Sequence, residues 1–116
     1  MQPVRLVDTR NGTGAAEHPV AANSSLRIKV TGSNGVPTGA TAVTLNLTGT
    51  DSTAATYLTA YADGTRPGTS NLNLVPGQTR PVQAVVPVDS SGYITVHNSA
   101  GSVDVIADLE GYFAFR

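Results

Sequence analysis

The side chains best suited to acid–base chemistry are two histidines, His18 and His97, which lie far apart in the sequence. Neither belongs to a Gly-x-Ser-x-Gly nucleophile motif, and the many serines lie in turn-like segments, where hydroxyl groups satisfy the backbone. Asp104 and Asp108 share one face of an expected strand, but four residues of extended chain separate them by about 13 Å. That distance exceeds the carboxyl separation used in glycoside hydrolysis. The sequence therefore favours a protein that is not an enzyme.

The sequence offers few metal ligands. Cysteine is absent, which excludes thiolate sites and disulfides, and two distant histidines make a weak case for zinc. Oxygen atoms of Asp8, Asn11 and Asp51 would suit calcium, although no EF-hand pattern contains them; the alternative is that these side chains cap turns. Gly12-Thr13-Gly14 lacks the lysine and the following helix of a phosphate-binding loop. We predict neither a metal nor a cofactor.

The densest polar cluster is Asp8-Thr9-Arg10. In a functional interpretation, Arg10 holds the carboxylate or a sugar hydroxyl of a ligand. In a structural interpretation, Arg10 pairs with Asp8 or with Asp108 and joins the first strand to the last. Buried charges need partners, and the two ends of the chain supply both signs. We predict a structural ion-pair cluster of Asp8, Arg10 and Asp108.

A candidate ligand surface follows from strand alternation between positions 57 and 75. The apolar side chains of this segment face the core, so the others share the opposite face: Tyr57, Thr59, Tyr61, Asn71 and Asn73. Aromatic rings stack on the C–H faces of sugars, and amides exchange hydrogen bonds with hydroxyls. We predict weak carbohydrate binding here, roughly micromolar to millimolar, because tryptophan is absent. The alternatives are a solvated sheet with stabilising Tyr–Thr pairs, or a subunit contact.

Strand-like alternation dominates the rest of the chain. The runs cover 26–30, 43–48, 57–62, 71–74, 93–97 and 103–109, and five turn dipeptides lie between or beside them: Asn11-Gly12, Asn34-Gly35, Asp63-Gly64, Pro76-Gly77 and Ser91-Gly92. Val82 to Val88 is more uniformly apolar, which predicts a strand buried on both faces. We expect an all-β fold of eight or nine strands, an antiparallel β-sandwich of jelly-roll type, with a barrel as the alternative.

Length and charge narrow the class of protein further. The 116 residues fit a single domain over 1–116, with no linker inside it. Seven basic and eight acidic residues give a net charge of -1 without a basic patch, which argues against nucleic acid or anionic membranes as partners. No apolar run reaches membrane-spanning length. The composition is rich in Thr, Val, Ala, Gly, Asn and Ser, as in extracellular β-modules, so we predict a secreted protein whose signal lies outside this sequence.

The two ends carry a family resemblance. The chain opens with Arg5-Leu6-Val7-Asp8-Thr9-Arg10 and closes with Asp108-Leu109-Glu110-Gly111-Tyr112-Phe113. With the segments between them, these motifs resemble a module recurrent in secreted actinobacterial proteins that begins with RLLDTR and ends with DVxGYF. The resemblance implies an accessory, surface-facing role beside other extracellular domains or in tandem copies. Many members carry a cysteine pair, and Asp63 and Thr95 occupy the corresponding places here, so this fold must hold without a disulfide.

Two functions are consistent with these features. The first is a non-catalytic extracellular module that binds a glycan or another cell-surface polymer. The second is a homotrimeric jelly-roll head with a structural or receptor-binding role. Aromatic residues near the C-terminus, Tyr112-Phe113-Ala114-Phe115, would supply its subunit contact.

Overall fold

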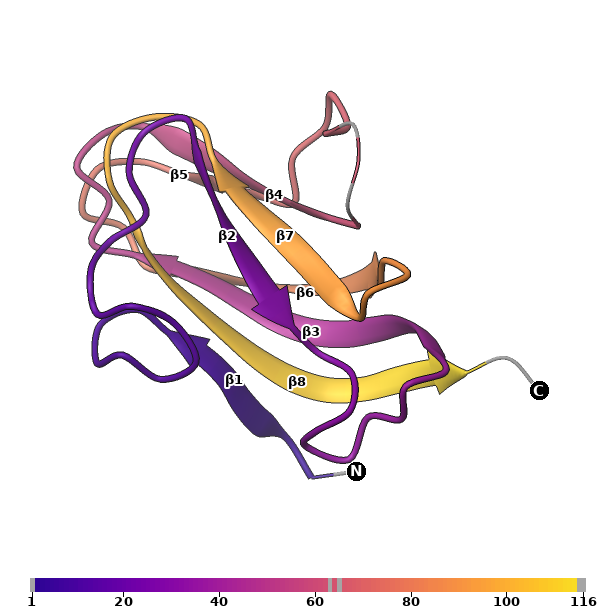
Figure 1. Cartoon of the computed structure of the whole chain (residues 1–116). Helices are drawn as coiled ribbons and strands as arrows, with labels where there is room; N and C mark the ends of the chain where they lie inside the picture. Colours follow the sequence, from indigo (N-terminus) through magenta and orange to yellow (C-terminus); the bar gives the residue numbers. More distant parts are fainter. Residues whose placement is uncertain (1, 63, 65, 115–116) are drawn as a thin grey trace.

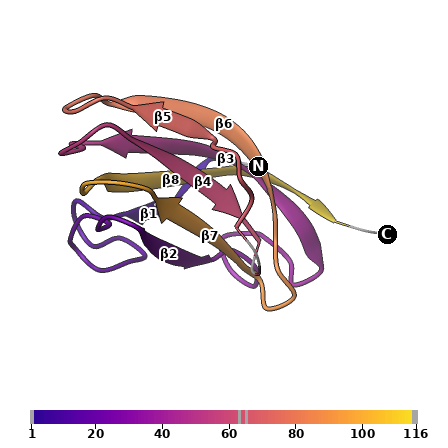
Figure 2. The same ribbon diagram turned by 90° about the horizontal axis from the view of Figure 1, so that it is seen from above.

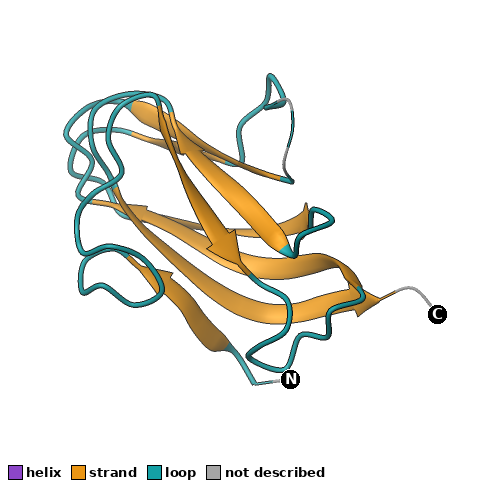
Figure 3. Ribbon diagram, in the orientation of Figure 1, coloured by secondary structure: helices purple, strands orange, loops and turns teal. Residues whose placement is uncertain are grey.

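The computed structural model describes residues 2–62, 64 and 66–114. These residues form eight β-strands, labelled in Figure 1: β1 (Val4–Asp8), β2 (Ser24–Lys29), β3 (Ala40–Thr50), β4 (Thr56–Tyr61), β5 (Leu72–Leu74), β6 (Arg80–Pro87), β7 (Tyr93–Asn98) and β8 (Asp104–Ala114). The segments between strands are turns and loops (Figure 3). Within the described part of the chain, no helix is long and apolar enough to span a membrane.

The strands form two four-stranded antiparallel sheets that pack face to face (Figure 2). The strand orders are β1-β8-β3-β6 and β2-β7-β4-β5. Each connection crosses from one sheet to the other except the one between β4 and β5, which are hydrogen-bonded neighbours. The prediction of an antiparallel β-sandwich is confirmed, and the alternative of a closed barrel is wrong.

The apolar faces of the strands meet between the sheets. Alternation puts a continuous set of aliphatic side chains there, and the largest that are fully buried include Val7, Val43, Leu45, Leu47, Leu58, Ile94, Val96, Val105 and Leu109. Burial of each such side chain stabilises the fold by about 1.5–3 kcal/mol relative to exposure. Among the described residues, every buried side-chain nitrogen or oxygen has a hydrogen-bond partner.

Strand β6 corrects one prediction. Val82 to Val88 was expected to be buried on both faces, but Val85 is 60% exposed while its neighbour Val86 is buried. The reason is the two-layer architecture: Val86 faces the other sheet, whereas Val85 faces outward on β6, which pairs only with β3 at the edge of its sheet. Pro81 and Pro87 fit this place, because an edge strand needs fewer backbone donors.

Tight turns hold the strand ends where the sequence contains Gly dipeptides. Asn34 and Gly35 both have positive φ, 53° and 82°, as a type I′ turn requires. The amide of Val36 donates to the carbonyl of Ser33 at 3.0 Å and closes this turn. At Gly92, φ is 86°, and a Cβ atom would clash with Thr31.

Candidate functional site

The candidate ligand surface lies on the outer face of the β2-β7-β4-β5 sheet. Tyr57 on β4 and Asn73 on β5 are cross-strand partners, and both are exposed, Tyr57 by 40%. Tyr61 lies further along β4, opposite Thr95, and is half-buried. Strand alternation therefore brings these tyrosines and Asn73 to one face.

Of the other two residues predicted for this surface, Thr59 is buried and Asn71 is half-buried. Thr59 is only 1% exposed, and its hydroxyl donates to the carbonyl of Thr69 at 2.8 Å. The side-chain oxygen of Asn71 accepts the amide of Ala60 at 2.8 Å, and the Asn71 amide donates to Leu58. Both side chains therefore hold the loop that joins β4 to β5.

This β4–β5 loop, residues 62–71, rises from the outer face of its sheet in the direction away from the other sheet (Figure 1). Its ten residues are too many for a tight hairpin turn, so the length of the segment between the two apolar runs was the available signal for this loop. The predicted turn residue Asp63 lies outside the described residues, while Gly64 has a φ of 108°.

The loop and Tyr57 together line a shallow hollow of about 270 Å³. Its other lining residues are Gly68, Thr69 and Ser70. The hydroxyl of Ser70 donates to the side-chain oxygen of Asn73 at 3.2 Å, which ties the loop to β5. The hollow thus combines one aromatic ring with polar backbone and hydroxyl groups.

His97 lies beside Thr59 on the same face and is 6% exposed. Its Nδ1 is 2.8 Å from the hydroxyl oxygen of Ser25 on β2, and its Nε2 contacts the guanidinium of Arg66 from the loop. A guanidinium only donates hydrogen bonds, so Nε2 accepts and the imidazole proton resides on Nδ1. Burial, assisted by the positive charge of Arg66, lowers the pKa of His97.

Serine and histidine can act as a nucleophile and its base, but the hydrogen bond between Ser25 and His97 runs in the wrong direction for that role. The lone pair of His97 points to Arg66, and its N–H donates to Ser25. In this arrangement His97 does not accept the proton of Ser25, as activation of a serine nucleophile requires. The contact instead joins β2, β7 and the β4–β5 loop.

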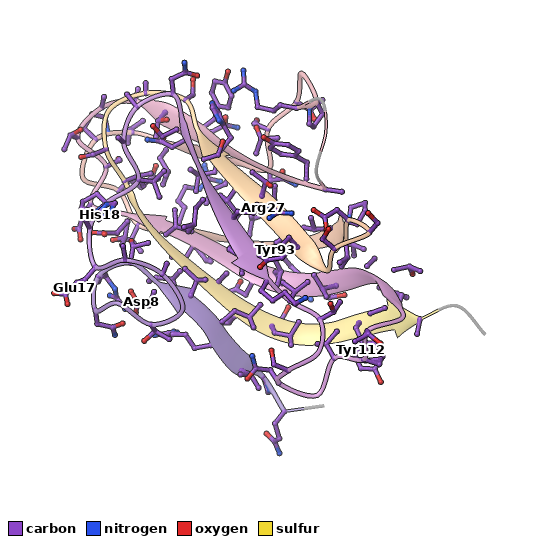
Figure 4. All side chains as sticks on the ribbon, in the orientation of Figure 1. Asp8, Glu17, His18, Arg27, Tyr93 and Tyr112 are labelled. Atoms are coloured by element: carbon purple, nitrogen blue, oxygen red, sulfur yellow. The ribbon has the colours of Figure 1, made fainter. Side chains whose placement is uncertain are left out.

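A second polar cluster lies at the end of β1, around Asp8 (Figure 4). Asp8 is fully buried, and Arg10 donates to its two carboxylate oxygens from Nε at 3.0 Å and Nη2 at 2.9 Å. The backbone amide of Arg10 adds a bond of 3.0 Å, and Arg5 approaches to 3.4 Å. These bonds, led by the side chain of Arg10, lower the pKa of Asp8.

Asp108 contacts a different arginine from the predicted one. Arg5 and Asp108 are directly opposite on the paired strands β1 and β8. The guanidinium donates to the two carboxylate oxygens, from Nε at 2.8 Å and from Nη2 at 3.2 Å. Arg10 therefore pairs with Asp8 and not with Asp108. The sequence contained Arg5 in the opening motif, but its partner became evident only once β1 and β8 were known to be neighbours.

Thr9 completes the link between the two ends of the chain. Its hydroxyl donates to Asp104 at 2.8 Å and accepts the backbone amide of Val105 at 3.0 Å. Its own backbone amide donates to the carbonyl of Val105. Each residue of the Asp8-Thr9-Arg10 segment therefore has a defined contact within the fold.

Two of the three residues considered for calcium, Asp8 and Asn11, have other partners, whereas Asp51 lies exposed with a positive φ of 57°. Asn11 accepts the amide and the hydroxyl of Thr13 with its side-chain oxygen, which is the bonding of a capped turn. The Asp8 carboxylate is already occupied by arginine. In the described part of the chain, no group of three or more His, Asp or Glu side chains is placed to hold a metal ion.

Tyr112, near the C-terminus, lies at the opposite end of its sheet from Asp8 (Figure 4). Tyr112 lines an open hollow of about 510 Å³ with the 32–38 loop. Phe113 is 54% exposed and faces Ala42 across β3 and β8. Phe115, the remaining aromatic of the predicted subunit contact, lies outside the described residues.

Of the two positions where the resemblance implies a cysteine pair, Asp63 is outside the described residues. Thr95 lies between Arg27 and Tyr61 on the outer face and is buried. Compared with known proteins, the chain matches no family model and no curated protein.

Proposed function

We propose that this chain is a non-catalytic module that binds carbohydrate at the hollow between Tyr57 and the β4–β5 loop. The observation that carries the proposal is the exposed Tyr57 ring beside the polar groups of Thr69 and Ser70. A tyrosine ring offers an apolar surface for the C–H face of a sugar, and the loop offers hydrogen-bond partners for hydroxyls. The hollow of about 270 Å³ has room for one sugar ring.

The expected affinity is low. A shallow hollow with a single aromatic ring buries little of a ligand, so a dissociation constant of roughly micromolar to millimolar is expected. Tandem copies or oligomers would raise the avidity. The near-neutral charge fits an extracellular polymer better than nucleic acid. We therefore propose a secreted accessory module of the RLLDTR type that acts at a cell surface.

We propose further that the sandwich is a jelly roll. The pairs β1–β8, β2–β7, β3–β6 and β4–β5 are all antiparallel neighbours. This is the pairing that one long hairpin gives when it is rolled into two sheets, with β4 and β5 at its tip. In that arrangement, the β4–β5 loop is the tip of the hairpin and is free to vary in length.

A homotrimeric head is the second candidate. It is favoured by the apolar side chains on the outer face of the other sheet, where Phe113 and Pro87 flank Ala42 and Val85 lies beside them. Exposed apolar side chains that gather in this way mark contact surfaces. A subunit interface through that face would leave the Tyr57 hollow open.

A glycan array with three proteins tests the binding proposal. The wild type should bind a set of glycans, Tyr57→Ala should lose that binding, and Tyr112→Ala should retain it because Tyr112 is an exposed tyrosine far from the hollow. Light scattering gives the solution mass of each protein. Absence of binding by the wild type, or equal binding by Tyr57→Ala, would contradict the proposal; a trimer that Phe113→Ser converts to a monomer would favour the head.

A further inference from the structure

The β4–β5 loop is held over the sheet at two points. Near its end, Thr69 and Asn71 bond to Thr59, Leu58 and Ala60 of β4. Nearer its start, and among the described residues before Thr69, the side-chain bond to the sheet is that of Arg66 to His97. Gly68, which lines the hollow, lies between these two points. The position of this part of the hollow therefore depends on the Arg66–His97 contact.

The Arg66–His97 contact exists only while His97 is neutral. Arg66 has no acceptor, so it needs the lone pair on Nε2. A proton on Nε2 removes that lone pair and places two cations against each other, and like charges in a buried place repel strongly. There are therefore two possible outcomes on acidification. Either a proton binds His97 and displaces Arg66, or Arg66 keeps the proton from binding.

The surroundings of His97 offer the proton no stabilising partner. On β2 its neighbour is Ser25, and the next outward side chain is Arg27, which is paired with Asp89 at 3.2 Å. On β4 its neighbour is Thr59, with Tyr57 and Tyr61 on either side. The loop contributes Arg66. Within the described residues, no carboxylate contacts His97, and burial and Arg66 both lower its pKa.

We propose that neutral His97 is the acid-sensitive anchor of the β4–β5 loop, so that protonation releases Arg66, loosens the Gly68–Ser70 side of the hollow and weakens ligand binding. The last step rests on the proposed function, whereas the release of the loop does not. His97 is a positioning residue in this scheme, because it does not line the hollow and acts through Arg66.

Nuclear magnetic resonance tests the loop directly. A His18→Gln background leaves His97 as the single imidazole in the chain. Between pH 8 and pH 5, the amide signals of Gly68, Thr69 and Ser70 should move with the same midpoint as the ring protons of His97. The order parameters of these amides should fall on the acid side from about 0.85 toward about 0.6, as expected for a loop that loses an anchor.

Two variants separate the proposal from general acid loosening. His97→Gln keeps an acceptor for Arg66 but does not titrate, so the order parameters of Gly68 to Ser70 should stay high throughout this range. Arg66→Met keeps the fold, because Arg66 is exposed; its loop should have low order parameters at every pH, and the midpoint of His97 should rise. Loop amides that ignore the titration of His97, or that still follow pH in His97→Gln, would overturn the proposal.

Ligand binding is measured separately with the methyl glycosides of glucose, galactose, mannose and N-acetylglucosamine. Any glycoside that binds at pH 7.5 should bind the His18→Gln protein severalfold more weakly at pH 5, and the His97→Gln protein equally at both. If no glycoside binds, the proposed function fails while the loop measurements still decide the anchor. Equal binding by His18→Gln at both pH values would contradict the effect on the ligand.

Discussion

Single buried polar residues join segments of this fold that are far apart in the sequence. Asn98 is fully buried at the end of β7, where its amide donates to the carbonyls of Val20, Ala21 and Gly101. Its side-chain oxygen accepts the hydroxyl of Thr56 at 2.7 Å. One side chain therefore joins two loops and the start of β4 to the end of β7, at a place where the sequence contained no recognisable motif.

Replacement of Asn98 should cost more stability than an ordinary polar substitution. Asn98→Ala leaves the three carbonyls and the Thr56 hydroxyl without their partner, so the free energy of unfolding should fall by about 2–3 kcal/mol. Asn73→Ala, on the exposed side of β5, is the control and should change it by less than about 0.5 kcal/mol. Urea denaturation of both variants gives the comparison, and equal midpoints would refute the importance of Asn98.

Three titratable residues should make the protein acid-sensitive. His97 has a lowered pKa through burial, and Asp8 and Asp89 have lowered pKa values through bonds to Arg10 and to the amide of Tyr93 respectively. The native state thus binds fewer protons than the unfolded chain, so stability falls as pH falls. The loss should start below about pH 6.5 for His97 and below about pH 4 for the aspartates.

Urea midpoints measured from pH 8 to pH 3 resolve the two stages. In His97→Gln, the decline between about pH 6.5 and pH 5 should disappear, while the decline below about pH 4 remains. A protein whose stability rises on acidification in either range would contradict the assigned directions.

At the scale of the elements, alternation predicted most strands and their inward faces, because a period of two is a local property of the chain. Alternation failed where the exposure of a side chain depends on neighbouring strands and loops. Val85 is apolar yet exposed since it lies on the outer face of its sheet, and Thr59 is polar yet buried since a loop covers it. The β4–β5 loop and the Arg5–Asp108 pair likewise depend on which strands lie side by side, and local periodicity does not contain that information.

Adjacent valines on β6 test the edge assignment. Val86→Thr places a hydroxyl in the core without a partner and should lower the free energy of unfolding by about 1–3 kcal/mol. Val85→Thr, one residue away on the exposed side, should change it by less than about 0.5 kcal/mol. Equal destabilisation by the two substitutions would mean that β6 is covered on both faces.

At the scale of the molecule, the sandwich brings the first and last strands together and leaves the β4–β5 loop exposed. β1 and β8 are neighbours, joined by Arg5–Asp108 and by the two bonds of Thr9 (Figure 2). The β4–β5 loop projects from the other sheet, over a face that carries Tyr57 and Tyr61 (Figure 1). In this division, the terminal motifs stabilise the scaffold, and the proposed site occupies a loop that the scaffold supports.

The most direct test of the proposed site is a titration of the ¹⁵N-labelled wild type with the same four methyl glycosides, at concentrations up to about 20 mM because the expected affinity is weak. The account predicts saturable shifts at Tyr57, Gly68, Thr69, Ser70 and Asn73, which surround the hollow. It also predicts that Val85 and Phe113, on the far sheet, do not shift. Saturable shifts confined to Val85 and Phe113, or none anywhere, would contradict carbohydrate binding at the β4–β5 loop.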